Sequence, residues 1–319
     1  MKTLALSLVA ASSIAGAALA QEPVWDANTV VLESQELAEG VFAVVQSGAD
    51  DMAANGVPIA TSSGFVIGDD GVLVIDTMLN VRLNTQLFNL IRAETDLPVR
   101  YAVNTSFHGD HAYGNQFLPD ETLIIQHSAT SDYISENLAA DKAFMIQNFG
   151  KGRGIEEIIV TPADILVADL GEIDVDLGGI TVTIRDYGFA QTGGDLFVSV
   201  PSENVLWTGN PVIADAPALP WLLDGHLIET RDTLQAVLND FDAETQIVPG
   251  HGPVTDISAI QWPIDYLTAV ETEVRAAVAE GLSLEDTVAR VQLPDYQGYA
   301  LFGWVHPGLN VPAAYQDLQ

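Results

Sequence analysis

A short stretch rich in histidine, residues 104–115, constrains the fold and chemistry of this chain more than any other part of its sequence. It holds His108, Asp110 and His111 within four residues. The preceding run, Val99–Val103, is apolar and β-branched and predicts a buried strand. We therefore expect the three side chains on a loop at the carboxyl end of a strand, where α/β sheets place their chemistry. Two imidazoles and a carboxylate at this spacing can bind a divalent cation such as zinc.

The stretch resembles the His-x-His-x-Asp-His loop that binds metal in the metallo-β-lactamase superfamily. It matches at His108, Asp110 and His111, whereas Ser106 stands where the first histidine is expected. A later family motif is intact at His251, within the sequence Pro-Gly-His-Gly. The loop thus keeps three of the four family residues and lacks the first histidine.

Two further family positions carry amides. Gln191 precedes Thr-Gly-Gly-Asp, where the family has histidine, and Asn210 follows Thr-Gly, where the family has an aspartate that bridges two metals. Asp76, at the end of a predicted strand, matches an aspartate that supports the loop through hydrogen bonds in the family. Capping of the following helix is the alternative role for Asp76.

The resemblance implies two metal positions of unequal quality. The residues of the first are Ser106, His108 and Gln191. The residues of the second are Asp110, His111, Asn210 and His251. Serine and amide oxygens are poor zinc donors, so the first position has lost most of its ligands while the second keeps an aspartate and two histidines. We expect one divalent metal in the second position, zinc first, with iron or manganese as alternatives because this donor set also suits iron(II).

Other interpretations of the same residues remain open. A metal in this site can recruit another histidine, of which His226 is the best placed in sequence and His127 and His306 are weaker candidates. A Ser106–His108 dyad is conceivable, although proximity in sequence does not make a nucleophile. The site can also be inactive, with Asp110 satisfied by backbone amides.

The favoured function is hydrolysis of an ester, lactone or amide bond in a small-molecule substrate. The metal would polarise the carbonyl and lower the pKa of a water molecule. His108 would shuttle a proton, and Gln191 and Asn210 would orient the water or hold the oxyanion. The rival function is a non-catalytic binding or scaffold protein of the same fold. The sequence predicts no oligomeric state.

The order of predicted elements favours one α/β domain over residues 21–319. Strands and hairpins come first, including a hairpin over 63–76, and helices over 81–95, 227–241 and 257–281 follow with further strands between them. A β run is expected at 29–32, a loop at 50–58, a helix from 127 to about 138 and a flexible flap over 142–154. The resemblance covers about 40–260 and implies a four-layer αββα sandwich of two mixed β-sheets with helices outside. The remainder, 257–319, adds C-terminal helices and a tail.

Charge and cysteine content limit the partners and the ligands. The chain has 44 acidic residues against 11 basic ones, a net charge of −33. Such a chain repels nucleic acid and anionic membranes, and we predict neither as a partner. The acids are scattered, which favours a solvated acidic surface over a site for cationic substrates. Cysteine is absent, so any metal must be held by histidine, carboxylate or amide.

The first twenty residues predict a secretory signal peptide. Lys2 supplies a short positive region, residues 4–11 are apolar, and Ala18-Leu19-Ala20 fits the small-x-small cleavage rule. We expect cleavage before Gln21 and a secreted, periplasmic protein with no membrane contact after removal of the signal. A single membrane anchor is the alternative, but the apolar run is short and contains serines.

Overall fold

The computed structural model describes residues 26–149 and 152–319. Its strands form two sheets, of seven strands in the order β1-β2-β3-β4-β5-β6-β7 and of five in the order β12-β11-β10-β9-β8. The first contains β1 (Leu32–Ala38), β2 (Val41–Gln46), β3 (Ser63–Gly68), β4 (Gly71–Ile75), β5 (Val99–Val103), β6 (Leu123–His127) and β7 (Ile165–Val167). The second contains β8 (Glu172–Asp176), β9 (Thr181–Arg185), β10 (Phe197–Val200), β11 (Val205–Gly209) and β12 (Gln246–Pro249).

Both sheets mix antiparallel and parallel pairing. Strands β1 to β4 pair antiparallel, whereas β4, β5, β6 and β7 run parallel. In the second sheet β8 to β11 are antiparallel and β12 joins β11 in parallel. Because parallel strands end at the same edge, the carboxyl ends of β4 and β5 lie together, as do those of β11 and β12.

Side chains of the first sheet alternate between two cores because successive residues of a strand face opposite sides. Leu73 and Ile75 of β4 belong to the cluster between the sheets, which also includes Trp207 of β11. Val72 and Val74 belong to the cluster on the outer face. Helix α2 (Val81–Glu94) covers that outer face and contributes buried leucines and an isoleucine to the cluster.

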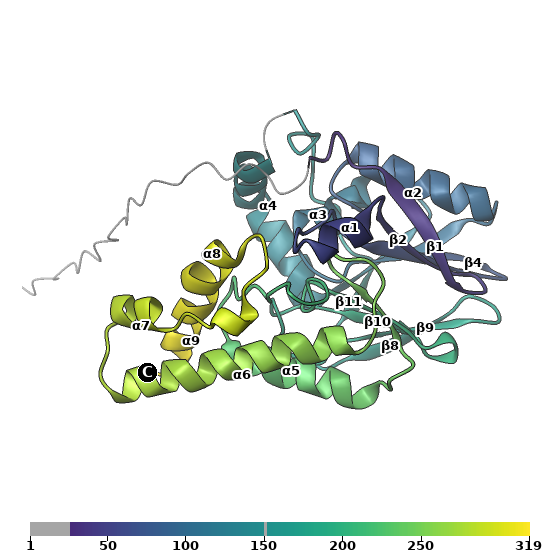
Figure 1. The fold of residues 1–319 in the computed structure, drawn as a ribbon. Coiled ribbons are helices and arrows are strands. Elements are labelled where there is room, and N and C mark those ends of the chain that lie inside the picture. The colour runs from purple at the N-terminus through teal and green to yellow at the C-terminus, as the bar shows by residue number, and fades with distance from the viewer. Residues whose placement is uncertain (1–25, 150–151) are drawn as a thin grey trace, which may run out of the picture.

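The second sheet is covered in the same way. Leu206 of β11 packs in a cluster with Leu234 of α5 (Leu227–Asp240) and Leu267 of α6 (Ser258–Ala279). Figure 1 shows α2 over one sheet and α5 and α6 over the other. The predicted four-layer αββα sandwich of two mixed sheets is therefore confirmed.

The N-terminal part differs from the prediction at two places. Residues 27–29 form a turn, in which the amide of Thr29 donates to the carbonyl of Asp26 at 2.8 Å, and the first strand begins only at Leu32. The expected loop at 50–58 contains a short helix, α1 (Ala49–Ala54), after Gly48. Alanines and a methionine make up most of α1 and are good helix formers, so the local sequence is compatible with this helix and the prediction of a loop was wrong there.

The expected flap over 142–154 is mostly helical. Helix α4 (Ser128–Phe149) continues well past residue 138, through a stretch of strong helix formers. Lys142 of this helix donates to the carbonyls of Glu156 and Ile158 at 2.8 and 2.7 Å, which ties the helix to the chain that follows it. The prediction of a flexible loop was therefore wrong for residues 142–149.

The tail after α6 forms a helical layer. It contains α7 (Leu284–Arg290), η3 (Pro294–Tyr296), α8 (Phe302–Val305), the π-helical turn η4 (His306–Asn310) and α9 (Val311–Asp317). Figure 1 shows α7, α8 and α9 gathered beside α6. His306 is buried here, where it accepts from the Tyr266 hydroxyl at 2.7 Å and contacts the Val291 carbonyl at 2.8 Å.

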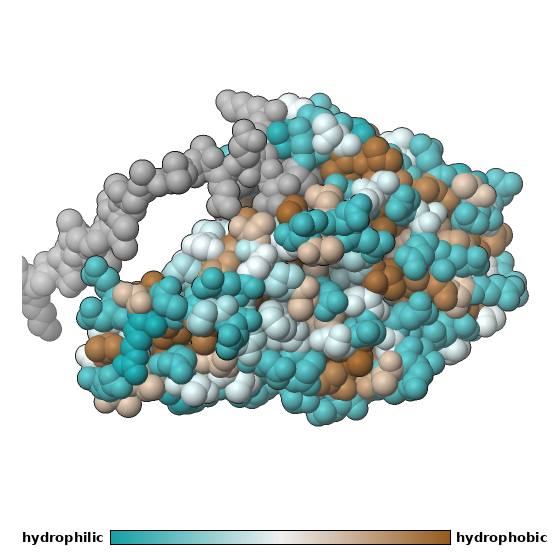
Figure 2. Space-filling view, in the orientation of Figure 1, coloured by the Kyte–Doolittle hydropathy of each residue, from teal (hydrophilic) through white to brown (hydrophobic). Residues whose placement is uncertain are grey.

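The predicted signal peptide lies outside the described residues. Within the described ranges, no helix is both long enough and apolar enough to cross a membrane. The face drawn in Figure 2 carries hydrophilic residues throughout, with hydrophobic residues in separate patches between them.

Candidate metal centre

The candidate site lies where four strand ends meet. Asp76 follows β4, and the loop with α3 (Gly109–Ala112) follows β5 in the first sheet. Asn210 follows β11 and His251 follows β12 in the second sheet. Side chains that are far apart in sequence therefore converge between the two sheets.

Asp110, His111 and His251 form a buried cluster whose ligand atoms all lie within 4.8 Å of one another. Asp110 Oδ2 is 3.3 Å from His251 Nε2 and 3.9 Å from His111 Nε2. In a tetrahedral zinc site with bonds of about 2.0–2.1 Å, neighbouring ligand atoms are roughly 3.3–3.4 Å apart. The observed spacing, the donor types and the burial therefore fit a divalent metal.

Asp76 fixes the orientation of His111. Its Oδ2 accepts from His111 Nδ1 at 2.7 Å and from the hydroxyl of Thr105 at 2.8 Å, and its Oδ1 accepts from the Thr105 amide at 2.8 Å. These bonds hold Asp76 at a φ of 57°, which non-glycine residues rarely adopt. Asn80, not Asp76, caps α2. Asp76 thus supports the loop that carries Asp110 and His111, as the resemblance implied.

The other two members of the cluster are held by the β2–β3 connection. His251 Nδ1 lies 3.0 Å from the carbonyl of Ile59, to which it donates, so that Nε2 is left as the free nitrogen. Asp110 Oδ2 accepts from the hydroxyl of Thr61 at 2.7 Å. Sequence reasoning missed Ile59 and Thr61, because no motif marks them.

A buried amide network holds the backbone of the loop. The carbonyl of His111 accepts from the amide of Thr77 at 2.8 Å and from Asn104 Nδ2 at 3.1 Å. Asn104 Oδ1 in turn accepts from Asn115 Nδ2 at 2.7 Å and Gln126 Nε2 at 2.8 Å. The only sequence signal for this network is the unusual number of amide side chains next to predicted strand ends.

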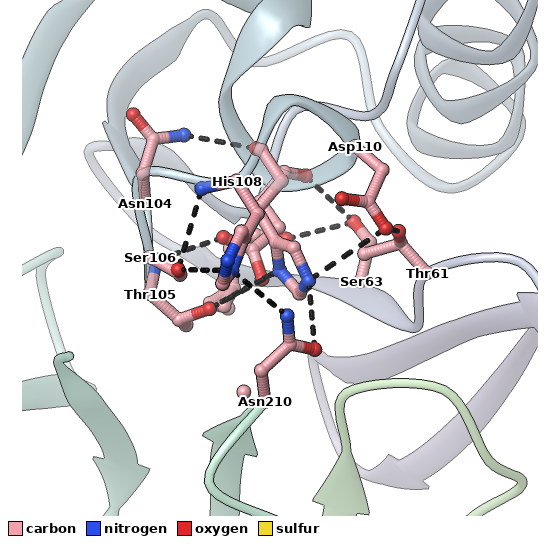
Figure 3. Close-up of polar contacts among 12 residues, drawn as sticks. Thr61, Ser63, Asn104, Thr105, Ser106, His108, Asp110 and Asn210 are labelled. Carbon is pink, nitrogen blue, oxygen red and sulfur yellow. Dashed lines mark hydrogen bonds and ion pairs between the residues drawn. The ribbon is translucent and has the colours of Figure 1, made fainter. Parts of the chain in front are cut away.

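Ser106 and His108, assigned to the first metal position, lie next to Asn210, which was assigned to the second. Ser106 Oγ is 2.9 Å from His108 Nδ1, and Asn210 Nδ2 is 3.2 Å from the same nitrogen (Figure 3). Asn210 Oδ1 lies 3.0 Å from His111 Nε2, so this amide joins the two rings. The residue after β12, Gly250, leaves room for it, because a Cβ there would lie 2.4 Å from Asn210 Oδ1.

The Ser106–His108 pair does form, but Ser106 is completely buried. Its hydroxyl also accepts from the His108 amide at 3.3 Å. A nucleophile must reach its substrate, so this geometry makes Ser106 a support for His108.

Gln191 lies beside the same site with its side chain unpaired. Asp195 Oδ2 accepts from the amides of Gln191 and Thr192 at 2.7 and 2.6 Å and so fixes the loop. Gln191 is only 2% exposed, yet neither its amide oxygen nor its amide nitrogen has a hydrogen-bond partner among the described residues.

The pKa values of His111 and Asp110 are shifted in opposite directions. Burial alone would lower the pKa of His111, but the carboxylates of Asp76 and Asp110 outweigh it and raise the pKa to about 9. Burial would raise the pKa of Asp110, but His111, His251 and the Thr61 hydroxyl lower it to about 2. Without metal, the cluster therefore holds an aspartate and a protonated His111 at neutral pH.

The two remaining histidines of the site are neutral. Burial lowers the pKa of His108 to about 4. The carboxylate of Asp110 acts in the opposite direction, and the imidazoles of His111 and His251 add to the lowering. Burial likewise lowers the pKa of His251. Both rings therefore offer lone pairs at pH 7.

A cavity of about 100 Å³ opens beside the cluster. Its polar lining consists of His108, Asp110, Gln191, Asn210 and His251. Its apolar lining consists of Pro58, Phe144, Met145, Trp221, Leu223 and Trp304. The predicted site residues other than the fully buried His111 thus face one cavity.

The structure does not bring the other histidines to the cluster. His226 is half exposed at the start of α5, where its ring packs against Phe189 at 4.4 Å. His127 faces Asp169 and Asp186 at 3.5 and 3.6 Å, and His306 is buried in the C-terminal layer. Recruitment of His226 as a ligand has no support in this geometry.

The four-layer fold and the buried Asp-His-His cluster between the sheets define a metallo-hydrolase-like architecture. The family model described as the metallo-β-lactamase superfamily matches residues 56–251. The chain therefore belongs to the metallo-β-lactamase superfamily. A comparison with curated proteins gives no match for this sequence.

Solved structures with this fold share little sequence with the chain. A metallo-β-lactamase from Pontibacter korlensis is 18% identical, with a TM-score of 0.58 over 75% of this chain and 99% of the other. The sec-alkylsulfatase Pisa1 from Pseudomonas sp. is 17% identical, with a TM-score of 0.70 over 90% of this chain and 50% of the other. The metallo-β-lactamase FIM-1 from Pseudomonas aeruginosa, in its mono-zinc form, is 17% identical, with a TM-score of 0.56 over 74% and 95%.

Proposed function

We propose that this chain is a hydrolase that cleaves an ester, lactone or amide bond with one divalent metal held by Asp110, His111 and His251. The observation that carries the proposal is the convergence of these three donors, with the second nitrogen of each histidine fixed by Asp76 or by the carbonyl of Ile59. Such outer contacts orient metal ligands. Zinc is the first candidate, and iron or manganese are alternatives.

A bound divalent metal supplies a Lewis acid that polarises a carbonyl and lowers the pKa of water. His108 lines the cavity with a ring that is neutral at pH 7 and has a lone pair free to accept a proton from water. Because its pKa is lowered to about 4, the ring would release that proton readily. Ser106 holds that ring in place. The amides of Gln191 and Asn210 face the same space and are suited to orient a water molecule or to hold an oxyanion.

We also propose that the protein is exported to the periplasm and acts there on a small molecule. The proposal rests on the charged, apolar and small-residue regions within the first twenty residues. Expression in a bacterium followed by N-terminal sequencing of the periplasmic fraction tests it. The expected first residue is Gln21, and recovery of intact chain in the cytoplasm contradicts export.

Metal analysis of untagged protein tests the hydrolase proposal most directly. We expect close to one equivalent of metal, hydrolysis of a simple activated ester or lactone, and loss of both in His251→Ala. His226→Ala is the matched control, since that histidine is half exposed and lies outside the cluster. Absence of bound metal, with no thermal shift on adding zinc, iron or manganese, would instead support the non-catalytic binding or scaffold function.

A further inference from the structure

The apolar wall of the cavity is built from three separate segments of the chain. Phe144 and Met145 come from α4, Trp221 and Leu223 from the connection between β11 and α5, and Trp304 from α8. Three of these large side chains remain well exposed, with Phe144 at 55% and Leu223 and Trp304 at 37%. Apolar side chains of this size left open beside a polar cluster suit an apolar ligand.

Trp304 lies well beyond the part of the chain that matches the superfamily, which ends at residue 251. Its ring meets that of Trp221 edge to face at 5.3 Å. Asn310 of the same C-terminal segment fixes the Trp221 loop, because it donates to the carbonyl of Pro220 at 2.8 Å and accepts from the amide of Leu222 at 3.0 Å. The C-terminal helices therefore shape the cavity wall as well as covering α6.

Gln191 marks the polar end of the same cavity. Its side chain is 2% exposed and lines the cavity, and both of its amide atoms lack a partner among the described residues. Buried polar groups are nearly always paired, so the amide of Gln191 must find its partner in the cavity that it faces, either water or the polar group of a ligand. A glutamine amide offers one donor edge and one acceptor edge side by side, which complements the carboxamide group of a ligand.

We propose that this cavity binds a neutral molecule that carries a carboxamide and an unbranched apolar chain. Gln191 pairs with the carboxamide, and the chain lies against Trp221, Trp304 and Phe144. A carboxylate in place of the amide is disfavoured, because the acidic side chain of Asp110 lines the same cavity and the whole chain carries a net charge of −33. That this molecule is also a substrate rests on the proposed hydrolase function. The bond that is cleaved would then lie toward Asp110.

Binding of simple amides to the metal-free full chain tests this inference. We expect the dissociation constants of butanamide, hexanamide and octanamide, measured by calorimetry, to fall about fourfold for each added methylene until the cavity is filled, which corresponds to ~0.8 kcal/mol per buried methylene. Octanoate should bind more weakly than octanamide. Equal affinity for the three amides, or tighter binding of octanoate, would overturn the proposal.

Variants separate the two ends of the cavity. Trp304→Ala should reduce the gain in affinity per methylene to less than about twofold, since it removes one of the large apolar side chains that line the cavity. Gln191→Leu should weaken all three amides by a common factor of about tenfold and keep the dependence on chain length. Trp262→Ala is the matched control, because that tryptophan lies on α6 against Tyr296, at 5.0 Å between rings, and does not line the cavity.

A second variant keeps the test decisive if Trp304→Ala does not fold. Phe144→Ala removes a half-exposed side chain that α4 contributes to the cavity and should likewise lower the gain in affinity per methylene. Unchanged gains in both Trp304→Ala and Phe144→Ala contradict the proposal. Because the protein is metal-free and no bond is cleaved, failure here leaves the metal site untouched, and absence of metal or hydrolysis leaves this binding result standing.

Discussion

Metal binding should be coupled to release of a single proton from His111. Without metal, His111 Nδ1 donates to Asp76, and Nε2 lies 3.0 Å from the amide oxygen of Asn210, an arrangement that suits a doubly protonated ring. Its pKa is raised to about 9, whereas Asp110 is already ionised and His251 is already neutral. A metal must therefore displace the Nε2 proton of His111 and no other.

The pKa of His111 sets how strongly the proton competes with the metal for Nε2. At pH 7 a group with a pKa of about 9 is protonated to about 99%, so the proton lowers the apparent metal affinity about a hundredfold, or ~2.7 kcal/mol. The apparent zinc affinity should then rise about tenfold per pH unit between pH 6.5 and 8.5. Calorimetry in buffers of different ionisation enthalpy should count close to one released proton at pH 7.

Two aspartate variants, one at the site and one on the surface, test whether Asp76 causes this pH dependence. Asp76→Asn removes a carboxylate that raises the pKa of His111, so the pH dependence should become shallower at the upper end of the range. Asp120→Asn neutralises an exposed carboxylate before β6 and should keep the full slope. A zinc affinity that stays constant from pH 6.5 to 8.5, or a proton count near zero at pH 7, would refute the assignment of a protonated His111.

Four further outcomes follow from the same geometry. The protein should retain at most one tightly bound metal, and Ser106→Ala should change the metal content little, so two zinc equivalents that resist dialysis would contradict the assignment. The triple change Ser106→His, Gln191→His, Asn210→Asp should bind a second zinc, although drift of supporting groups can cost about tenfold to a hundredfold in affinity; a folded triple variant that titrates no extra metal would show that these positions do not share a site. Gly250→Ala should destabilise the protein by about 1–3 kcal/mol, because its Cβ would lie 2.4 Å from Asn210 Oδ1, whereas Gly303→Ala, with no atom within 4 Å, should not lower the melting temperature. The metal-free protein should lose stability as the pH rises from 6.5 to about 9, because the pKa of His111 is raised in the folded state and its contribution is complete only below 6.5; thermal melts that improve over this range would argue against it.

The sequence predicted the elements whose signal is local. The apolar run Val99–Val103 and the hairpin with Asp70-Gly71 at its turn are strands in the structure, because composition and turn chemistry within a few residues decide them. The motif residues Asp110, His111 and His251 were predicted together from the family resemblance, and the structure brings them within reach of one metal. The helical course of residues 142–149 was missed because the glycines later in that segment suggested a loop too early.

Contacts between distant segments were decided only by the tertiary structure. His251 donates to Ile59 across 192 residues of sequence, and Asp110 accepts from Thr61 across 49, so neither contact leaves a local pattern. The same holds for Trp304, which reaches the cavity through the packing of the C-terminal helices. The sequence by itself thus determined which groups can do chemistry and the fold that carries them. The packing of the two sheets and their helices decided which of those groups meet, because burial, tautomer and cavity shape depend on atoms that are close in space and far apart along the chain.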